Sequence, residues 1–287
     1  MNIFGKYWHK FKYGNYLTKI LYINIAVYVI IGVFRVFLFL LKIGNQGLYY
    51  PPNYLMLPAD INTILLMPWT IITYMFTHEE LLHILFNMLW LYWFGKIFID
   101  YLGSKKLLHT YIFGGLLGGC FYILAFNIFP IFQDVLLTSR ALGASASVLA
   151  IVVAISFYIP NYTLNLLFLG QVKIKHIAIF TIIIDFLSIA SENSGGHIAH
   201  LGGAFYGALY GLLLRTNKFK MPSFKINWKS NKKRTKKNVR FMKDDEYNYE
   251  KAKAQKEIDA ILDKIAKHGY NSLSDKEKET LFKAGNK

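Results

Sequence analysis

The chain has 287 residues, of which 54% are hydrophobic and 17% are aromatic, and its mean hydropathy is +0.30. This composition excludes an ordinary soluble domain and is typical of a helical protein that crosses the membrane several times. The net charge of +16 would also fit a nucleic-acid-binding protein, but membrane proteins concentrate Lys and Arg on their cytoplasmic segments. We therefore expect no nucleic acid partner.

The first 16 residues are basic and aromatic, and they lack the short apolar core and cleavage site of a secretory signal. We expect them to lie at the membrane interface. An apolar run follows from residue 17 to about 41, and because a charge is costly at mid-bilayer, we expect the first span to end near Arg35. The segment 36–77 contains four prolines and is too apolar for a solvated linker, which indicates a re-entrant or interfacial loop.

Five further apolar segments are long enough to form helices. They cover residues 81–99, 107–126, 143–158, 174–189 and 197–214. Lys and Arg are frequent in the second and fourth connections and in the tail, but scarce in the first, third and fifth connections. This alternation predicts an all-α bundle of six membrane-spanning helices over residues 17–214, with both termini in the cytoplasm. Because no targeting peptide is visible, we expect a multi-pass protein of a bacterial plasma membrane.

The composition of the tail changes at about residue 243. Residues 215–243 hold twelve basic and no acidic residues, so anionic lipid headgroups are the expected partner of this juxtamembrane linker. Residues 244–287 mix both charges, with apolar residues at helical spacing and a capping box from Ser274 to Glu277. They predict a small cytoplasmic helical hairpin with a docking or regulatory role. A solvated tail with little order fits the same pattern and stays open.

Ser145 stands near the start of the apolar segment 143–158, which as a helix would be about 24 Å long, shorter than a bilayer core of about 30 Å. Pro160 and Asn161 mark the far end, so the end that carries Ser145 is expected to lie below the membrane surface. The first N–H groups of a helix have no partner and the helix dipole is positive there. This position can therefore hold both a hydroxyl nucleophile and an oxyanion.

His200 is followed on its own helix face by Gly203 and Gly207, which let another helix approach closely. If that helix carries Ser145, a hydroxyl and an imidazole come within hydrogen-bond reach, as an activated serine nucleophile requires. A lone serine in a membrane helix more often serves packing, and Ser147 is the better candidate for that role.

Other polar residues inside the expected spans also need partners. His83 and Asn87 lie one turn apart on one helix face, where they could serve a reaction or form a structural hydrogen bond between helices. Asp185 is a charge within the fifth span and has no assigned partner. Four further histidines near span ends are expected simply to lie in the interface: His78, His109, His176 and His197.

Three motifs occur in order along the chain: HILFN, GASAS, which begins at Gly143, and AHLGGAFYG. Over residues 73–214 the chain resembles the rhomboid family of intramembrane serine proteases, whose patterns are H-x-x-x-N, G-x-S-G and A-H-x-x-G-x-x-x-G. The resemblance implies that Ser145 is the nucleophile and His200 is its base, in a dyad without a third acid. It implies peptide-bond hydrolysis at the bilayer boundary.

By the same resemblance, His83 and Asn87 stabilise the oxyanion, and Gly143, Gly203 and Gly207 are close-packing glycines. The expected substrates are single-span membrane proteins. Neither a metal nor another cofactor is implied.

Two positions depart from the family pattern. Ala146 replaces the glycine that usually follows the serine, and Leu149 stands where many members place an aromatic residue against the histidine. The orientation of His200 is therefore expected to come from elsewhere, from packing and from water, because no carboxylate is expected beside it. The alternative function is that of a non-catalytic binding or quality-control protein with the same fold. A transporter is disfavoured because the sequence shows neither internal repeats nor paired broken helices.

Overall fold

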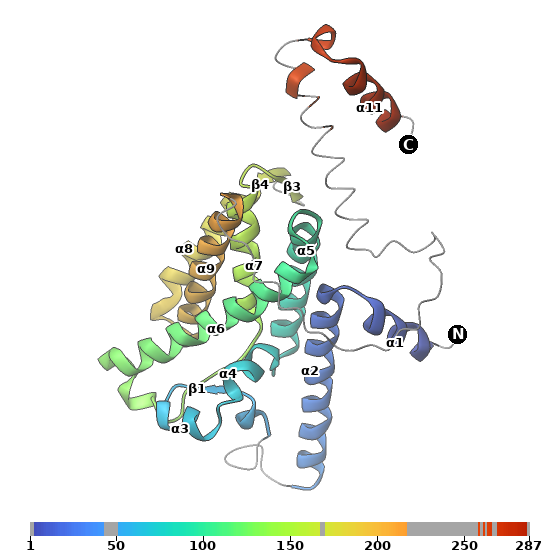
Figure 1. The fold of residues 1–287 in the computed structure, drawn as a ribbon. Coiled ribbons are helices and arrows are strands. Elements are labelled where there is room, and N and C mark those ends of the chain that lie inside the picture. Colours follow the sequence, from blue (N-terminus) through green and yellow to red (C-terminus); the bar gives the residue numbers. More distant parts are fainter. Residues whose placement is uncertain are drawn as a thin grey trace. The chain divides into compact units, whose positions relative to one another are not determined.

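The computed structural model describes residues 3–42, 51–166 and 170–216, and in the tail residues 258, 261, 263–265 and 269–285. The chain divides into two compact units, one of residues 1–99 with 104–224 and one of residues 100–103 with 225–287. Each unit is described by itself. Helices dominate the first unit (Figure 1).

The longer described helices of the first unit correspond to the expected apolar segments, except for the first helix, which lies in the basic and aromatic N-terminus. They are α1 (Ile3–Tyr13), α2 (Tyr16–Leu40), α5 (Leu81–Leu102), α6 (Ser104–Ile128), α7 (Ser145–Tyr158), α8 (Ile174–Leu187) and α9 (Ser194–Arg215). Two small antiparallel sheets accompany them. Strand β1 (Leu57–Pro58) pairs with β2 (Arg140–Ala141), and β3 (Thr163–Leu166) pairs with β4 (Gly170–Lys173), with Leu57 opposite Ala141 and Thr163 opposite Lys173.

Helix α2 continues through Arg35 to Leu40, and the whole helix is a candidate membrane span, so the expectation that the first span ends near Arg35 was wrong. The guanidinium Nη1 of Arg35 donates a hydrogen bond to the backbone oxygen of Glu79 at 3.3 Å. A charged group with a protein partner need not face lipid, so it does not end the helix. The connection that follows begins after Leu40 rather than at Val36.

This connection contains several short elements rather than one irregular loop. They are η1 (Pro51–Tyr54), β1, α3 (Ile61–Leu66), α4 (Thr70–Thr73) and η2 (Tyr74–Phe76). Asp60 caps α3 by accepting hydrogen bonds from the hydroxyl and the backbone N–H of Thr63 at 2.7 and 2.8 Å. These two hydrogen bonds lower the pKa of the Asp60 carboxyl below its usual value.

Buried hydrogen bonds fasten the connection to α6. The hydroxyl of Tyr74 donates to the backbone oxygen of Gly115 at 2.5 Å, and the hydroxyl of Tyr111 donates to that of Met75 at 2.6 Å. Strand β1 also pairs with β2, which lies shortly before α7. The connection therefore positions the segment that leads into α7.

Helix α7 is the centre of the first unit, because every residue from Ala146 to Ser156 is buried. It packs against α6, α8 and α9 (Figure 1). Three glycines of α9 lie against backbone oxygens of α7, with Gly203 on Ala146, Gly207 on Ala150 and Gly211 on Ala154. Because the residue numbers of the contacting pairs increase in the same direction along both helices, α7 and α9 run parallel.

Helix α6 contacts α7 in the opposite order. Gly118 lies against the methyl group of Ala146, and Gly114 lies against that of Ala150. Helix α6 is therefore antiparallel to α7. Small residues let all three helices approach closely, which is the main source of attraction between helices that share a lipid solvent.

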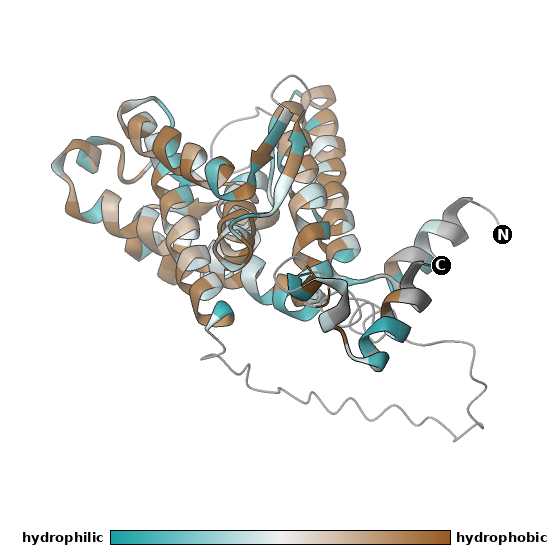
Figure 2. Ribbon diagram, turned by 90° about the horizontal axis from the view of Figure 1, so that it is seen from above, coloured by the Kyte–Doolittle hydropathy of each residue, from teal (hydrophilic) through white to brown (hydrophobic). Residues whose placement is uncertain are grey.

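Three described helices, α2, α5 and α6, are both long and apolar enough to cross a bilayer. Helix α9 has 22 residues but is less apolar, and α7 and α8 have 14 residues each, about 21 Å. Hydrophobic residues, drawn in brown, make up much of the helical ribbon in Figure 2. The chain is thus a membrane protein, and the count of six crossings remains a prediction.

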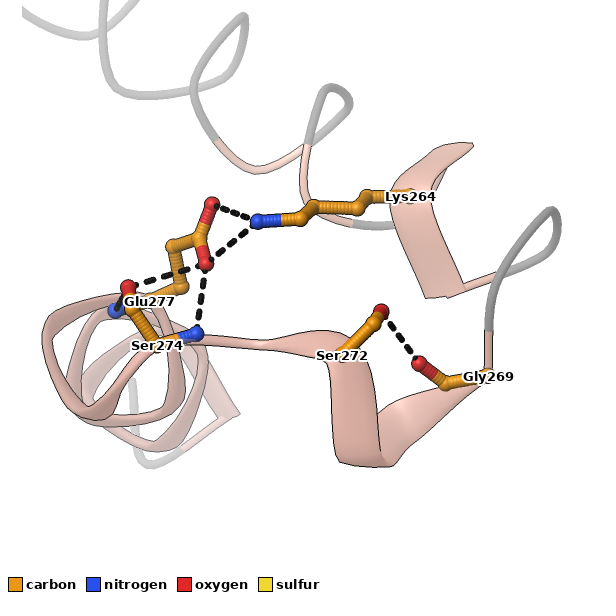
Figure 3. A network of polar contacts seen from close by, with 5 residues as sticks. All are labelled: Lys264, Gly269, Ser272, Ser274 and Glu277. Atoms are coloured by element: carbon orange, nitrogen blue, oxygen red, sulfur yellow. Dashed lines mark hydrogen bonds and ion pairs between the residues drawn. The ribbon is translucent and has the colours of Figure 1, made fainter.

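In the tail, helix α11 (Asp275–Gly285) begins at the predicted capping box, which is present. The backbone N–H and hydroxyl of Ser274 donate to Oε2 of Glu277 at 2.7 and 2.9 Å, and Lys264 donates to both Glu277 oxygens at 2.9 Å (Figure 3). The hydrogen bond from Lys264, followed by those from Ser274, lowers the pKa of Glu277 to about 2.

The basic linker 215–243 lies almost wholly outside the described residues, which include only Arg215 and Thr216 of it. The first helix of the predicted hairpin is described only at residues 258, 261 and 263–265, all of which are helical. The lipid contact and the hairpin remain predictions.

Candidate active site

Ser145 is the first residue of α7, and a strained turn leads into it. Gly143 has φ +116°, which disfavours any residue with a side chain, and its N–H donates to the backbone oxygen of Tyr74 at 2.9 Å. A Cβ at this position would lie 2.8 Å from Cε1 of His83 and 3.6 Å from the hydroxyl of Ser145. The glycine therefore lets the His83 ring lie next to the start of α7.

His200 is brought toward the same place by the contact of α9 with α7. Gly203, one turn after His200, lies against the backbone of Ala146, the residue that follows Ser145. Ser145 and His200 both line a cavity of about 930 Å³. The close approach of these two helices brings a hydroxyl and an imidazole into the lining of one cavity.

His83 and Asn87, on α5, line the same cavity. The amide nitrogen of Asn87 donates to the backbone oxygen of His83 at 3.0 Å and lies 3.4 Å from Nε2 of His78. These contacts join Asn87 to its own helix and to the loop before it. They do not form the hydrogen bond between two helices that was the structural alternative for Asn87.

His78 was expected at the interface, but it is fully buried, so this expectation was wrong. Its Nε2 accepts a hydrogen bond from the N–H of Ala144 at 3.2 Å, so the hydrogen of the neutral ring lies on Nδ1. Burial lowers the pKa of His78 to about 3, which keeps the ring uncharged. His78 thus ties the peptide before Ser145 to Asn87. The sequence carries no periodic signal for this contact, because it joins a loop to a helix start.

Asp185, on α8, is only 7% exposed and faces two histidines of α9. Its Oδ1 lies 2.7 Å from Nδ1 of His200 and 2.8 Å from Nδ1 of His197. The expectation of a histidine without a neighbouring acid was therefore wrong. His197, which was expected simply to lie in the interface, contacts the same acid. An acid within an apolar segment signals that a partner exists. Its partners lie 12 and 15 residues away on another helix, where spacing alone cannot identify them.

Asp185, His197 and His200 also form the one described group of three side chains that could hold a metal ion, with ligand atoms within 4.8 Å of one another. Ligands about 2.1 Å from one zinc ion would stand roughly 3.4 Å apart in a tetrahedron. The two contacts of Asp185 are shorter than this and have the length of charge-assisted hydrogen bonds. This geometry fits hydrogen bonding better than metal binding.

An ionised carboxylate can only accept hydrogen bonds, so Nδ1 of His200 carries a hydrogen in this arrangement. The other ring nitrogen, Nε2, is then left as a base. A base on the wall of a cavity that also holds a serine at a helix N-terminus is the minimum equipment for acyl transfer.

Comparisons with known proteins match two regions of the chain to protein families. The family model described as the Rhomboid domain matches residues 66–217, and a family of unknown function (DUF6576) matches residues 242–284. The chain is 34% identical over 160 residues to the RHOMBOID-like protein 12, mitochondrial, of Arabidopsis thaliana, covering 53% of this chain and 48% of the relative. It is 28% identical over 142 residues to the Presenilin-associated rhomboid-like protein A, mitochondrial, of Danio rerio, covering 47% of this chain and 34% of the relative.

Proposed function

Because the chain belongs to the rhomboid family, we propose that it is an intramembrane serine endopeptidase that cleaves single-span membrane proteins. The observation that carries the proposal is the meeting of Ser145, His200, His83 and Asn87 on one cavity, which draws them from three helices. A chain that only needed close helix packing would have no reason to gather these four polar side chains at one helix start.

In the proposed reaction, Oγ of Ser145 attacks the carbonyl carbon of the scissile peptide, and its proton moves to Nε2 of His200. His200 then gives that proton to the leaving amine, and a water molecule hydrolyses the acyl-enzyme by the reverse sequence. The first N–H groups of α7, with His83 and Asn87, stabilise the oxyanion. The N–H of Ala144 is excluded from this role, because it is bonded to His78.

We also propose that α2, α5, α6, α7, α8 and α9 each cross the membrane once. The parallel pairing of α7 with α9 and the antiparallel pairing with α6 support this count, because helices two crossings apart must point the same way. The basic connections then place both termini in one compartment and the start of α7 in the other. The relatives are mitochondrial by name, which gives no support to the bacterial plasma membrane expected from the sequence.

The basic linker 215–243 is proposed to hold the tail against anionic lipid, at about 1 kcal/mol for each well-placed charge. When the full chain is embedded in anionic vesicles, binding of the linker to the vesicle surface should weaken as the salt concentration rises. An association that salt does not change would favour a protein partner for the tail.

A serine-directed fluorophosphonate probe tests the proposed catalysis. It should label the detergent-solubilised protein at Ser145, and the label should be lost in Ser145→Ala and strongly reduced in His200→Ala. Ser147→Ala is the matched control, because the hydroxyl of Ser147 is buried against Met75 and does not line the cavity. This variant should label normally.

Turnover of a model transmembrane substrate completes the test. Asn87→Ala should lower kcat by about ten- to a thousandfold and leave KM largely unchanged, as expected for the loss of one oxyanion donor. Folded wild-type protein that neither labels nor cleaves would instead indicate a non-catalytic binder of the same fold.

A further inference from the structure

The aromatic residue that would orient His200 is replaced by Leu149, yet a catalytic base needs a fixed ring orientation and tautomer. Asp185 is the acidic side chain in contact with this ring in the described structure. We propose that Asp185 is a positioning residue that holds Nδ1–H of His200 and turns Nε2 toward Ser145. This inference rests on the proposed proteolysis and concerns the same site.

The geometry meets the requirements for such a residue. The contact of 2.7 Å between Oδ1 of Asp185 and Nδ1 of His200 has the length of a charge-assisted hydrogen bond. The Asp185 side chain is 10% exposed and that of His200 is 22% exposed, so water competes little for this contact. Asp185 and His200 both line the cavity beside Ser145.

The second histidine explains why Asp185 keeps its orientation. His197 lies one turn before His200 on α9, and its Nδ1 is 2.8 Å from the same carboxylate oxygen. The Nδ1–H groups of both histidines, on one face of α9, therefore donate to one carboxylate oxygen of Asp185 on α8. Asp185 cannot rotate away from His200 without also losing the hydrogen bond to His197.

The proton balance of the reaction is unaffected by Asp185. The proton of the Ser145 hydroxyl moves to Nε2 of His200 as the oxygen attacks, and Asp185 remains ionised throughout. Its negative charge stabilises the imidazolium at that moment, and its hydrogen bond selects the tautomer that can accept the proton. Both effects act in the transition state rather than in substrate binding.

A purely structural role would tie α8 to α9 and would be served equally by an amide. Asp185→Asn distinguishes the two, because it keeps the shape of the side chain and one acceptor but removes the charge. We expect kcat for a model transmembrane substrate to fall by up to about 10,000-fold, the loss seen when the acid of a serine triad is neutralised, with KM unchanged. Asp185→Glu, which retains the charge, should recover part of the loss.

Asp134→Asn is the matched control for the loss of one negative charge. Asp134 is exposed in η3 (Pro130–Val135) and does not line the cavity, so kcat should be unaffected. Full activity of Asp185→Asn, or equal losses in Asp185→Asn and Asp134→Asn, would overturn the inference.

A spectroscopic measurement separates this inference from the proposed function, because it needs no activity. In the Ser145→Ala protein, the Nδ1–H proton of His200 should resonate far downfield, as a hydrogen bond to a carboxylate requires, and His200→Gln should assign the signal by removing it. The signal should disappear in Asp185→Asn. Its absence with Asp185 in place would overturn the inference even if the wild type is active. Its presence in a wild-type protein that neither labels nor cleaves would overturn the protease and still support the contact.

Discussion

Helices α2 and α7 are both apolar, but they occupy opposite environments. Helix α2 has 25 residues and buries five of them, whereas α7 has 14 residues and buries eleven. The side chains of α2 are mostly large, while the face of α7 that meets α9 is built from Ala146, Ala150 and Ala154. In a lipid solvent large apolar side chains gain nothing by meeting one another, so burial follows from small residues that allow backbone contact. The helix that carries Ser145 is central because the residues that it turns toward α6 and α9 are small.

The largest expected effect comes from placing a bulky side chain where helices contact each other through their backbones. The comparison is the same change in α2, where no such contact is made. Gly203→Leu should separate α9 from α7, because even a Cβ there would clash with the backbone of Ala146. We expect a cost above about 3 kcal/mol, the upper end for overpacked cores, and loss of probe labelling. Gly32→Leu in α2 is the control, because an added Cβ meets nothing within 4 Å there. Thermal unfolding in detergent should show no loss of stability for Gly32→Leu.

Equal destabilisation by Gly203→Leu and Gly32→Leu would contradict the view that close backbone contact distinguishes the two helices.

A smaller change tests the entry into α7. Gly143→Ala forces a side chain into φ +116° and against the ring of His83, so turnover should fall by about ten- to a hundredfold while the protein stays folded. Gly170→Ala separates backbone strain from the ring contact, because Gly170 has φ +67° and open space around it. This variant should lose about 1 kcal/mol of stability and keep its activity. Equal activity losses in both variants would show that strain alone is responsible.

The smallest expected effect is the pH dependence of stability caused by His78, the uncharged histidine that contacts the peptide before α7. The pKa of His78 is about 3 in the folded protein, against 6.5 for an exposed histidine. Between these values the unfolded chain binds a proton that the folded chain does not, so stability falls as the pH is lowered through this range. From pH 7 to 5 the loss should be about 2 kcal/mol. His78→Gln should reduce this pH dependence of thermal unfolding, and an unchanged pH dependence would contradict a buried neutral His78.

The helices and the meeting of Ser145 and His200 at one cavity could be predicted from the sequence because their signals are local. Apolar runs mark the helices, and Ser145 and His200 lie within short motifs whose glycines determine packing. The partners of Asp185, His78 and Arg35 could not be predicted in the same way. Each contact joins elements that only the folded chain brings together, over 15, 66 and 44 residues. A polar residue in an apolar segment indicates that a partner exists but does not identify it.

Hydrolysis consumes one water molecule for every peptide bond, and a bilayer core contains almost none. The cavity beside Ser145 is lined by the charged residues Glu79, Glu80, Arg140 and Glu192 as well as by apolar side chains. Charged groups retain their hydration, so in the proposed reaction this lining would keep the second reactant near Ser145. The proposed acyl-enzyme would then persist until a water molecule from this cavity attacks it.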